Sequence, residues 1–154
     1  MCHWNGNTTT DTNLLLIIGV HLFETSPKLS EVNLASNAIS RLNDGTFGHL
    51  TSLSLLDLSH NSLMRIEDNV FVGMNISHLD LGYNNLRKMP SLPLRKLTAA
   101  RTLILDGNPL HFLGKFLLRV LKFYVRLKTF ELPGWVKEDV WLLQLLQLLL
   151  LVYS

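Results

Sequence analysis

Cysteine is almost absent from the chain. Cys2 stands alone among 154 residues, so no disulfide can form within the chain and no zinc cluster can be built from thiolates. A small secreted domain held together by disulfides is therefore excluded. Charged residues are also few, at 17%, whereas apolar residues make up 47% and supply enough material for a continuous core in one domain.

Motifs that carry catalysis or hold a cofactor are missing as well. The sequence contains no glycine-rich phosphate loop, no nucleophile elbow and no metal-spaced group of His, Cys and Asp. Its six histidines fall in different expected turns and strands rather than on one face of a helix. We therefore expect a protein that is not an enzyme, with no catalytic residue, no cofactor and no metal.

No apolar run is long enough to cross a bilayer as a helix. Residues 140–153 are apolar apart from two glutamines, but this run is shorter than the roughly 20 residues that a transmembrane helix needs. The apolar run at residues 14–23 has the length of a signal-peptide core, yet no Lys or Arg precedes it and Asp11 does. We prefer to interpret it as part of a repeat, with a signal peptide as the alternative.

What the chain does contain is an internal repeat with the pattern L-x-L-x-x-N. The pattern occurs four times in register, and its asparagines are Asn37, Asn61, Asn84 and Asn108. Apolar residues follow each asparagine at fixed positions. The apolar residues that stand ten positions after the asparagines are Phe47, Phe71, Leu94 and Leu118. Two apolar residues with one residue between them point to the same side of a strand, so each unit presents one apolar pair inward. No unit can bury that face alone, so neighbouring units are required.

The asparagine stands where each expected strand ends and the chain must turn. Its carboxamide can donate and accept hydrogen bonds with backbone groups of its own turn and of neighbouring turns. Because the same residue returns in every unit, we predict a buried structural ladder of asparagines along the protein.

Residues 29–113 resemble the leucine-rich-repeat family, in the variant of about 24 residues per repeat. The resemblance implies an α/β solenoid, an arc with a parallel sheet of about four strands on its concave face and irregular or short helical returns on its convex face. It also implies a protein-binding module that is extracellular or at the cell surface. The cysteine-rich caps of extracellular members are missing here, so the chain is either a piece of a longer ancestral protein with a replaced tail or a repeat domain capped by helices.

Residues 1–28 are interpreted as a degenerate N-terminal repeat or cap. When the register is extended backward by 24 residues, the positions that match Asn37, Ile39, Leu42 and Phe47 are Asn13, Leu15, Ile18 and Phe23. The strand positions of this first unit would then be Thr8 and Thr10, which are polar. This interpretation accounts for the apolar run without a signal peptide.

Residues 114–154 are predicted to form a helical tail, with the repeats ending after Asn108. A basic amphipathic helix over residues 110–130 would carry on one face the cations Lys115, Arg119, Lys122 and Arg126. Pro133 and Gly134 would end it, and a second helix is expected over residues 136–152.

The helices of this tail have two interpretations. In the first they cap the solenoid. In the alternative the protein is membrane-associated or regulatory and acts through the basic helix, which would touch an anionic membrane or bind a partner. Nucleic acid is not expected as a partner, because no surface aromatics interleave with the basic residues and no recognised binding motif is present.

The strand register also predicts where a protein partner binds. Residues beside the inward leucines face outward on the concave sheet, and with the strand ends the predicted partner-binding set is Glu31, Asn33, Asp57, His60, His78, Asp80, Tyr83 and Asp106. The same rule places Ser59 and Gly82 outward. Adjacent strands lie about 4.8 Å apart, so the acidic residues would form a band opposed mainly by Arg101, which favours a basic partner. The alternative is that these aspartates merely keep the face solvated.

Two N-glycosylation sequons begin at Asn7 and Asn75. They make these asparagines possible glycosylation sites in a secreted protein. Chance alone predicts about as many sequons in a chain with this many asparagines, so the sequons carry little weight for localisation.

Overall fold

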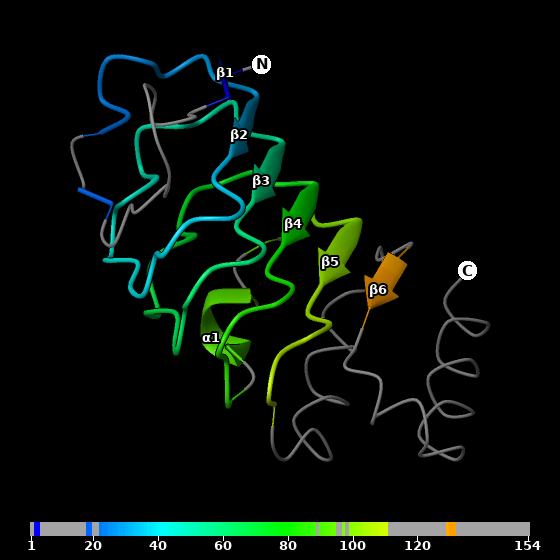
Figure 1. The fold of residues 1–154 in the computed structure, drawn as a ribbon. Helices are drawn as coiled ribbons and strands as arrows, with labels where there is room; N and C mark the ends of the chain where they lie inside the picture. The colour runs from blue at the N-terminus through cyan, green and yellow to red at the C-terminus, as the bar shows by residue number, and fades with distance from the viewer. Residues whose placement is uncertain are drawn as a thin grey trace, which may run out of the picture.

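The computed structural model describes residues 2–3, 18–19, 22–88, 90–94, 97, 99–110 and 129–131. Through these residues the chain winds as a solenoid, and each turn adds one short strand to a single parallel sheet (Figure 1). The strands, in their hydrogen-bonded order, are β1 (Cys2–His3), β2 (Glu31–Asn33), β3 (Leu55–Asp57), β4 (His78–Asp80), β5 (Thr102–Ile104) and β6 (Thr129–Glu131). The short helix α1 (Ser91–Leu94) lies on the returning side of the turn between β4 and β5.

The strands pair in the register that the repeat predicts. The middle residues of the four interior strands lie opposite one another and are buried; they are Val32, Leu56, Leu79 and Leu103. The apolar residues two positions further on are buried as well; they are Leu34, Leu58, Leu81 and Leu105. The core therefore lies behind the sheet, between the strands and the returning segments.

Large side chains from the returning segments fill the other half of this core. Phe47, Phe71 and Leu94 are fully buried, as expected for the tenth position after each asparagine. The Phe23 ring stacks on Phe47 with a centroid distance of 5.7 Å. One continuous apolar cluster thus runs from Ile18 to Leu110 through the described turns.

The first turn does not have the strand register predicted for it. Cys2 lies opposite Val32, so the paired residues are 30 positions apart, and Thr8 is not the residue in register. Ile18 and Phe23 are nevertheless buried, as expected for the second half of a repeat. The prediction of the strand was wrong because counting backward assumes a constant repeat length, which this turn does not keep.

A sequence signal for the correct register was present and was missed. Cys2, Trp4 and Asn7 have the spacing of the repeat pattern, with apolar residues at its first two positions. Gly6 then stands where Gly107 stands in the last complete unit. Asn7 itself lies outside the described residues.

The repeats also do not end after Asn108. β6 pairs with β5, with Phe130 opposite Leu103, so a further turn follows in which the paired residues are 27 positions apart. The predicted helix over residues 110–130 is therefore wrong at both ends, since Leu110 is not helical and Phe130 lies in a strand. The tail assigned to residues 114–154 contains this strand, and the sheet has six strands rather than about four.

The rest of the predicted tail lies outside the described residues. This applies to all four cations of the basic helix and to the second helix expected over residues 136–152. Within the part of the chain that the structure describes, no helix combines the length and the apolar character needed to cross a membrane.

Candidate functional site

Asparagine side chains join successive turns at the edge where the strands end. The Nδ2 of Asn61 donates to the carbonyls of Leu58 and Ser59 in its own turn, at 3.0 and 3.1 Å, and to the carbonyl of Leu34 in the preceding turn, at 2.9 Å. Its Oδ1 accepts the backbone N–H of Ile39 at 3.0 Å. Asn61 is only 8% exposed, so this side chain satisfies backbone groups that water does not reach.

Asn84 and Asn108 repeat this geometry one and two turns further on. Each donates to a carbonyl of the preceding turn, at 2.9 Å for Leu58 and 2.8 Å for Leu81. Each also accepts an N–H of the preceding turn at 3.0 Å. Asn37 is only half-buried, and its two described bonds run to carbonyls of its own turn.

The residue before each of these asparagines has a left-handed backbone. The φ angles are 56° for Ser36, 52° for His60, 51° for Tyr83 and 69° for Gly107. A residue with a side chain pays about 1–2 kcal/mol for this conformation, and the asparagine ladder beside it supplies the hydrogen bonds that hold the turn. These four residues form one row across the ends of the strands, which we call the end row.

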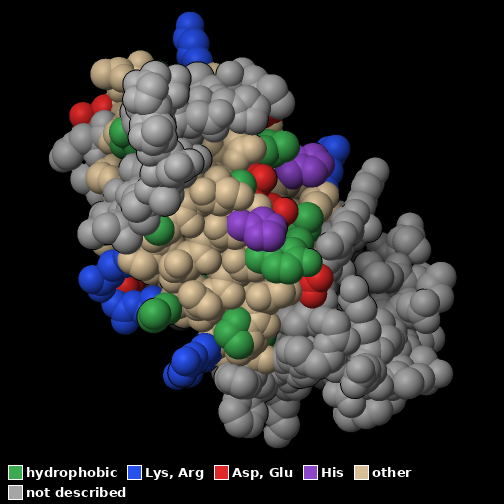
Figure 2. Space-filling view, in the orientation of Figure 1, with side chains coloured by type: hydrophobic (Ala, Val, Ile, Leu, Met, Phe, Trp, Pro, Cys, Tyr) green, Lys and Arg blue, Asp and Glu red, His purple; other side chains and the backbone are tan. Residues whose placement is uncertain are grey.

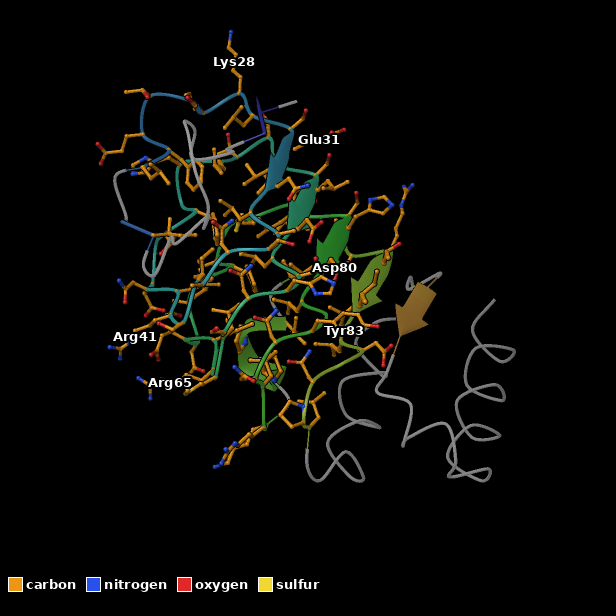
Figure 3. The ribbon with its side chains drawn as sticks, in the orientation of Figure 1. Lys28, Glu31, Arg41, Arg65, Asp80 and Tyr83 are labelled. Carbon is orange, nitrogen blue, oxygen red and sulfur yellow. The ribbon has the colours of Figure 1, made fainter. Side chains whose placement is uncertain are left out.

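Two members of the end row stack their rings on each other. The rings of His60 and Tyr83 are 4.5 Å apart between centroids and only 4° from parallel. The other side of Tyr83 meets Gly107, because a Cβ added to this glycine would lie 2.6 to 2.9 Å from three atoms of the ring. Tyr83 is still 54% exposed, and Figure 3 shows it beyond the ends of the strands.

Asp57 and Asp80 lie directly opposite each other in β3 and β4. The Oδ1 of each accepts the backbone N–H two residues further on, at 2.9 and 2.8 Å. Asn33 accepts the equivalent N–H in the turn of β2, at 2.9 Å. The three side chains thus share a structural role, and the bond fixes where each one lies.

This bond explains why two residues predicted to face outward are buried. Ser59 is 8% exposed, and Gly82 is buried as well. A Cβ at Gly82 would lie 3.0 Å from the Oδ1 of Asp80, so the aspartate side chain covers this position. Alternation along the strand could not predict the result, because the chain has already begun to turn here.

The predicted partner-binding residues lie in two places, some at the starts of the strands and the others at the ends of the strands. Glu31 and His78 lie at the strand starts, where His78 Nδ1 is 2.8 Å from the Oγ of Ser77. Asp106 lies at the opposite end, where its carbonyl accepts the N–H of Tyr83 at 2.7 Å. Glu31 is therefore not part of the acidic group at the strand ends (Figure 3).

Asp57, Asp80 and Asp106 thus share the strand ends with the stacked rings of His60 and Tyr83. We call these five residues the concave end. Figure 2 shows red carboxylates, purple histidines and green hydrophobic side chains close together on this face. The described residues contain no group of three or more His, Cys, Asp or Glu side chains placed to hold a metal ion.

Serines at the strand starts form a second row of contacts that the sequence analysis missed. The Oγ of Ser54 donates to the carbonyl of Ser30, and the Oγ of Ser77 donates to the carbonyl of Ser54, both at 3.0 Å. Their spacing of 24 and 23 residues matches that of the asparagines and could have revealed the row. Of the two sequons, Asn75 is exposed and Asn7 lies outside the described residues.

Comparisons with known proteins agree with this architecture. A family model described as "Leucine rich repeat" matches residues 11–63 and 27–86. The chain is 32% identical over 138 residues to Toll-like receptor 9 of Bos taurus, covering 78% of this chain and 13% of that protein. It is 38% identical over 84 residues to keratocan of Gallus gallus, covering 52% of this chain and 23% of keratocan.

A solved structure has a similar fold over most of the chain. It is that of the Toll–Spatzle complex, described as a molecular hub in Drosophila development and innate immunity, and the match has a TM-score of 0.65 at 26% identity. The match covers 79% of this chain but only 17% of the other. The chain therefore spans less than a quarter of these longer proteins.

Proposed function

The chain belongs to the leucine-rich-repeat family, and on that premise we propose that it is a non-catalytic module that binds a protein partner through the concave face of its sheet. We propose further that it does so outside the cell or at the cell surface. The partner-binding residues would be those of the concave end and Asn33, which lies opposite Asp57 at the same strand ends, with Glu31 and His78 extending the surface toward the strand starts.

The observation that carries this proposal is the exposed ring pair of His60 and Tyr83 beside in-register carboxylates. Exposed tyrosines held rigid by their surroundings provide contact area at little cost in side-chain entropy and are enriched in protein interfaces. Tyr83 is fixed between His60 and Gly107 and still exposes more than half of its surface. Such a side chain offers a preorganised contact to a partner.

The comparisons support a binding role for this architecture. Toll, whose fold is similar over most of this chain, is found in a complex with Spatzle. The similarity to Toll-like receptor 9 and keratocan favours an extracellular or cell-surface location for this chain. The exposed Asn75 would then be a candidate for N-glycosylation.

The test substitutes three side chains of the concave end with residues that should keep the turns folded. The variant combines Asp57→Asn, Asp80→Asn and Tyr83→Asn. Asparagine already accepts the equivalent N–H in the turn of β2, and it tolerates the left-handed backbone of residue 83 better than most residues. A matched control combines Met64→Gln, Asp68→Asn and Val72→Thr, three exposed residues outside the strands.

Affinity is measured by surface plasmon resonance against a partner isolated from extracellular proteins. We expect the concave-end variant to melt cooperatively and to lose at least about tenfold in affinity, which corresponds to about 1.4 kcal/mol. The control variant should bind as the wild type does. Unchanged affinity in a folded concave-end variant would remove the binding site from this face.

A further inference from the structure

We propose that the concave end recognises an arginine side chain in a basic segment of the protein partner. The guanidinium stacks on the outer face of the His60 ring and pairs with the carboxylate of Asp57. This inference rests on the proposed function and names the chemistry of the partner at that same surface. Three properties of the described residues carry it: an unfinished stack, fixed carboxylates beside it and the sign of the surrounding charge.

Among the described residues, the ring stack along the end row is open at one end. Tyr83 is covered on one side by His60 and on the other by Gly107. On the far side of His60, the next member of the row is Ser36, which is exposed and small. The N–H of Ser36 donates to the carbonyl of Ser59 at 3.0 Å, so Ser36 lies directly beside the turn that carries His60. A planar group above Ser36 would continue the stack at the spacing already set by the two rings.

A fixed carboxylate accompanies each ring of the stack. Ser59 directly precedes His60, and its N–H donates to the Oδ1 of Asp57. This bond holds the Asp57 carboxylate beside the turn that carries His60. In the same way, the N–H of Gly82, which precedes Tyr83, donates to the Oδ1 of Asp80. A carboxylate has about four acceptor positions, so one backbone bond leaves Asp57 able to accept from a guanidinium. Its orientation is fixed before the partner arrives, which lowers the entropic cost of binding.

The surrounding charges favour a cation over an anion. On the described part of the concave face the acidic side chains are Glu31, Asp57, Asp80 and Asp106, and the exposed cation is Arg101 at the start of β5. Arginine suits this surface better than lysine, because its planar guanidinium stacks on a ring and also forms two parallel hydrogen bonds with a carboxylate. Lysine offers only a point charge. The geometry therefore points to arginine rather than to positive charge alone.

The test compares two fluorescent heptapeptides in which serine alternates with arginine or with lysine. Fluorescence anisotropy measures their affinities for the full chain at the same salt concentration. We expect the arginine peptide to bind about threefold to fivefold more tightly, as a cation stacked at an exposed site predicts. The Asp57→Asn, Asp80→Asn double variant should weaken both peptides about tenfold, whereas Asp68→Asn, an exposed charge outside the strands, should change neither.

The His60→Ser variant tests whether the arginine side chain stacks on the His60 ring. Serine occupies the equivalent position at residue 36, so the turn has a natural precedent for it. The substitution should abolish the preference for arginine and leave lysine affinity unchanged. His60→Asn, which also suits a left-handed backbone, provides a second version if the serine variant does not fold.

Equal binding of the two peptides by the wild type would overturn the inference, as would an arginine preference that survives in both His60 variants. These outcomes are distinct from failure of the proposed function. A partner whose binding depends on the concave end but not on His60 would leave the proposed function standing and remove the arginine site. A partner that ignores the concave end would remove the proposed function itself.

Discussion

The interior turns of the solenoid and its two end turns differ in length. From Asn37 to Asn108 the asparagines are 24, 23 and 24 positions apart, whereas paired strand residues are 30 positions apart in the first turn and 27 in the last. In the interior, each asparagine bonds fixed backbone groups of the preceding turn, so an insertion between a strand and its asparagine would break those bonds. The ladder therefore fixes the segment from each strand to its asparagine, whereas the length of the whole turn varies by one residue in the interior and by more at the two ends.

The largest expected effect is the loss of stability when a core phenylalanine is truncated, and it should differ between an interior turn and the first turn. Phe47 is fully buried between turns, whereas Phe23 is 8% exposed in the first turn and stacks on it. Phe47→Ala should lower the free energy of unfolding by roughly 3–5 kcal/mol, and Phe23→Ala should lower it clearly less. Urea denaturation measures both, and an equal loss would show that the first turn is packed as tightly as the interior.

The second effect concerns the asparagines themselves. Asn61→Leu leaves the carbonyl of Leu34 and the N–H of Ile39 without their partner and should cost about 1–3 kcal/mol. Asn37→Leu should cost less, because Asn37 is half-buried whereas Asn61 is only 8% exposed. Asn43→Leu, outside the ladder, is the matched control. If Asn61→Leu and Asn43→Leu had the same stability, the structural role of the ladder would be disproved.

The third effect tests the end row. Gly107→Ala adds a Cβ 2.6 Å from the Tyr83 ring at a residue with positive φ, and we expect a loss that exceeds the cost of the backbone conformation alone, which is about 1–2 kcal/mol. In a Tyr83→Ser background the contact with the ring is gone, so the same substitution should cost about 1–2 kcal/mol, the backbone part alone. Thermal melts of the wild type, the two single variants and the double variant give the coupling energy between residues 83 and 107. Additive losses would show that the Tyr83 ring does not rest on Gly107.

The smallest effect lies outside the strands. Glu67 pairs with Arg65 at 2.7 Å and with Arg41 of the preceding turn at 3.5 Å, and Figure 3 shows both arginines away from the sheet. Because these arginines are more than half exposed, Glu67→Gln should cost about 0.5 kcal/mol and less in high salt. A loss as large as that of Asn61→Leu would mean that ion pairs, not asparagines, join the turns.

The sequence predicts the interior turns well because three independent signals coincide there. The apolar pair, the asparagine and the buried residue ten positions on all return with one period, and the structure places each where the period requires. At the ends only part of the pattern remains. Phe130 and Leu132 keep the apolar spacing, but Trp135 stands where the asparagine would be, so extrapolating a constant period missed β6.

The concave end could be predicted only in part. Alternation along the strands identified Asp57 and Asp80 as neighbours, and the structure places them opposite each other. The stacking of His60 on Tyr83 depends on the left-handed backbone of both residues, which alternation does not encode. Gly107 at the equivalent position of the last complete unit was the available hint, because glycine is the residue that adopts this conformation without cost.

Hydrogen exchange at single backbone amides tests most directly the claim that each asparagine joins its turn to the preceding one. The N–H of Leu63 donates to Asn84, and the N–H of Leu86 donates to Asn108. In Asn84→Leu, measured by NMR, exchange at Leu63 should become about tenfold to a hundredfold faster, in line with a loss of about 1.4–2.8 kcal/mol. Exchange at Leu86 should stay close to the wild-type rate. Unchanged protection at Leu63, or an equal acceleration at both amides, would contradict the ladder as the link between turns.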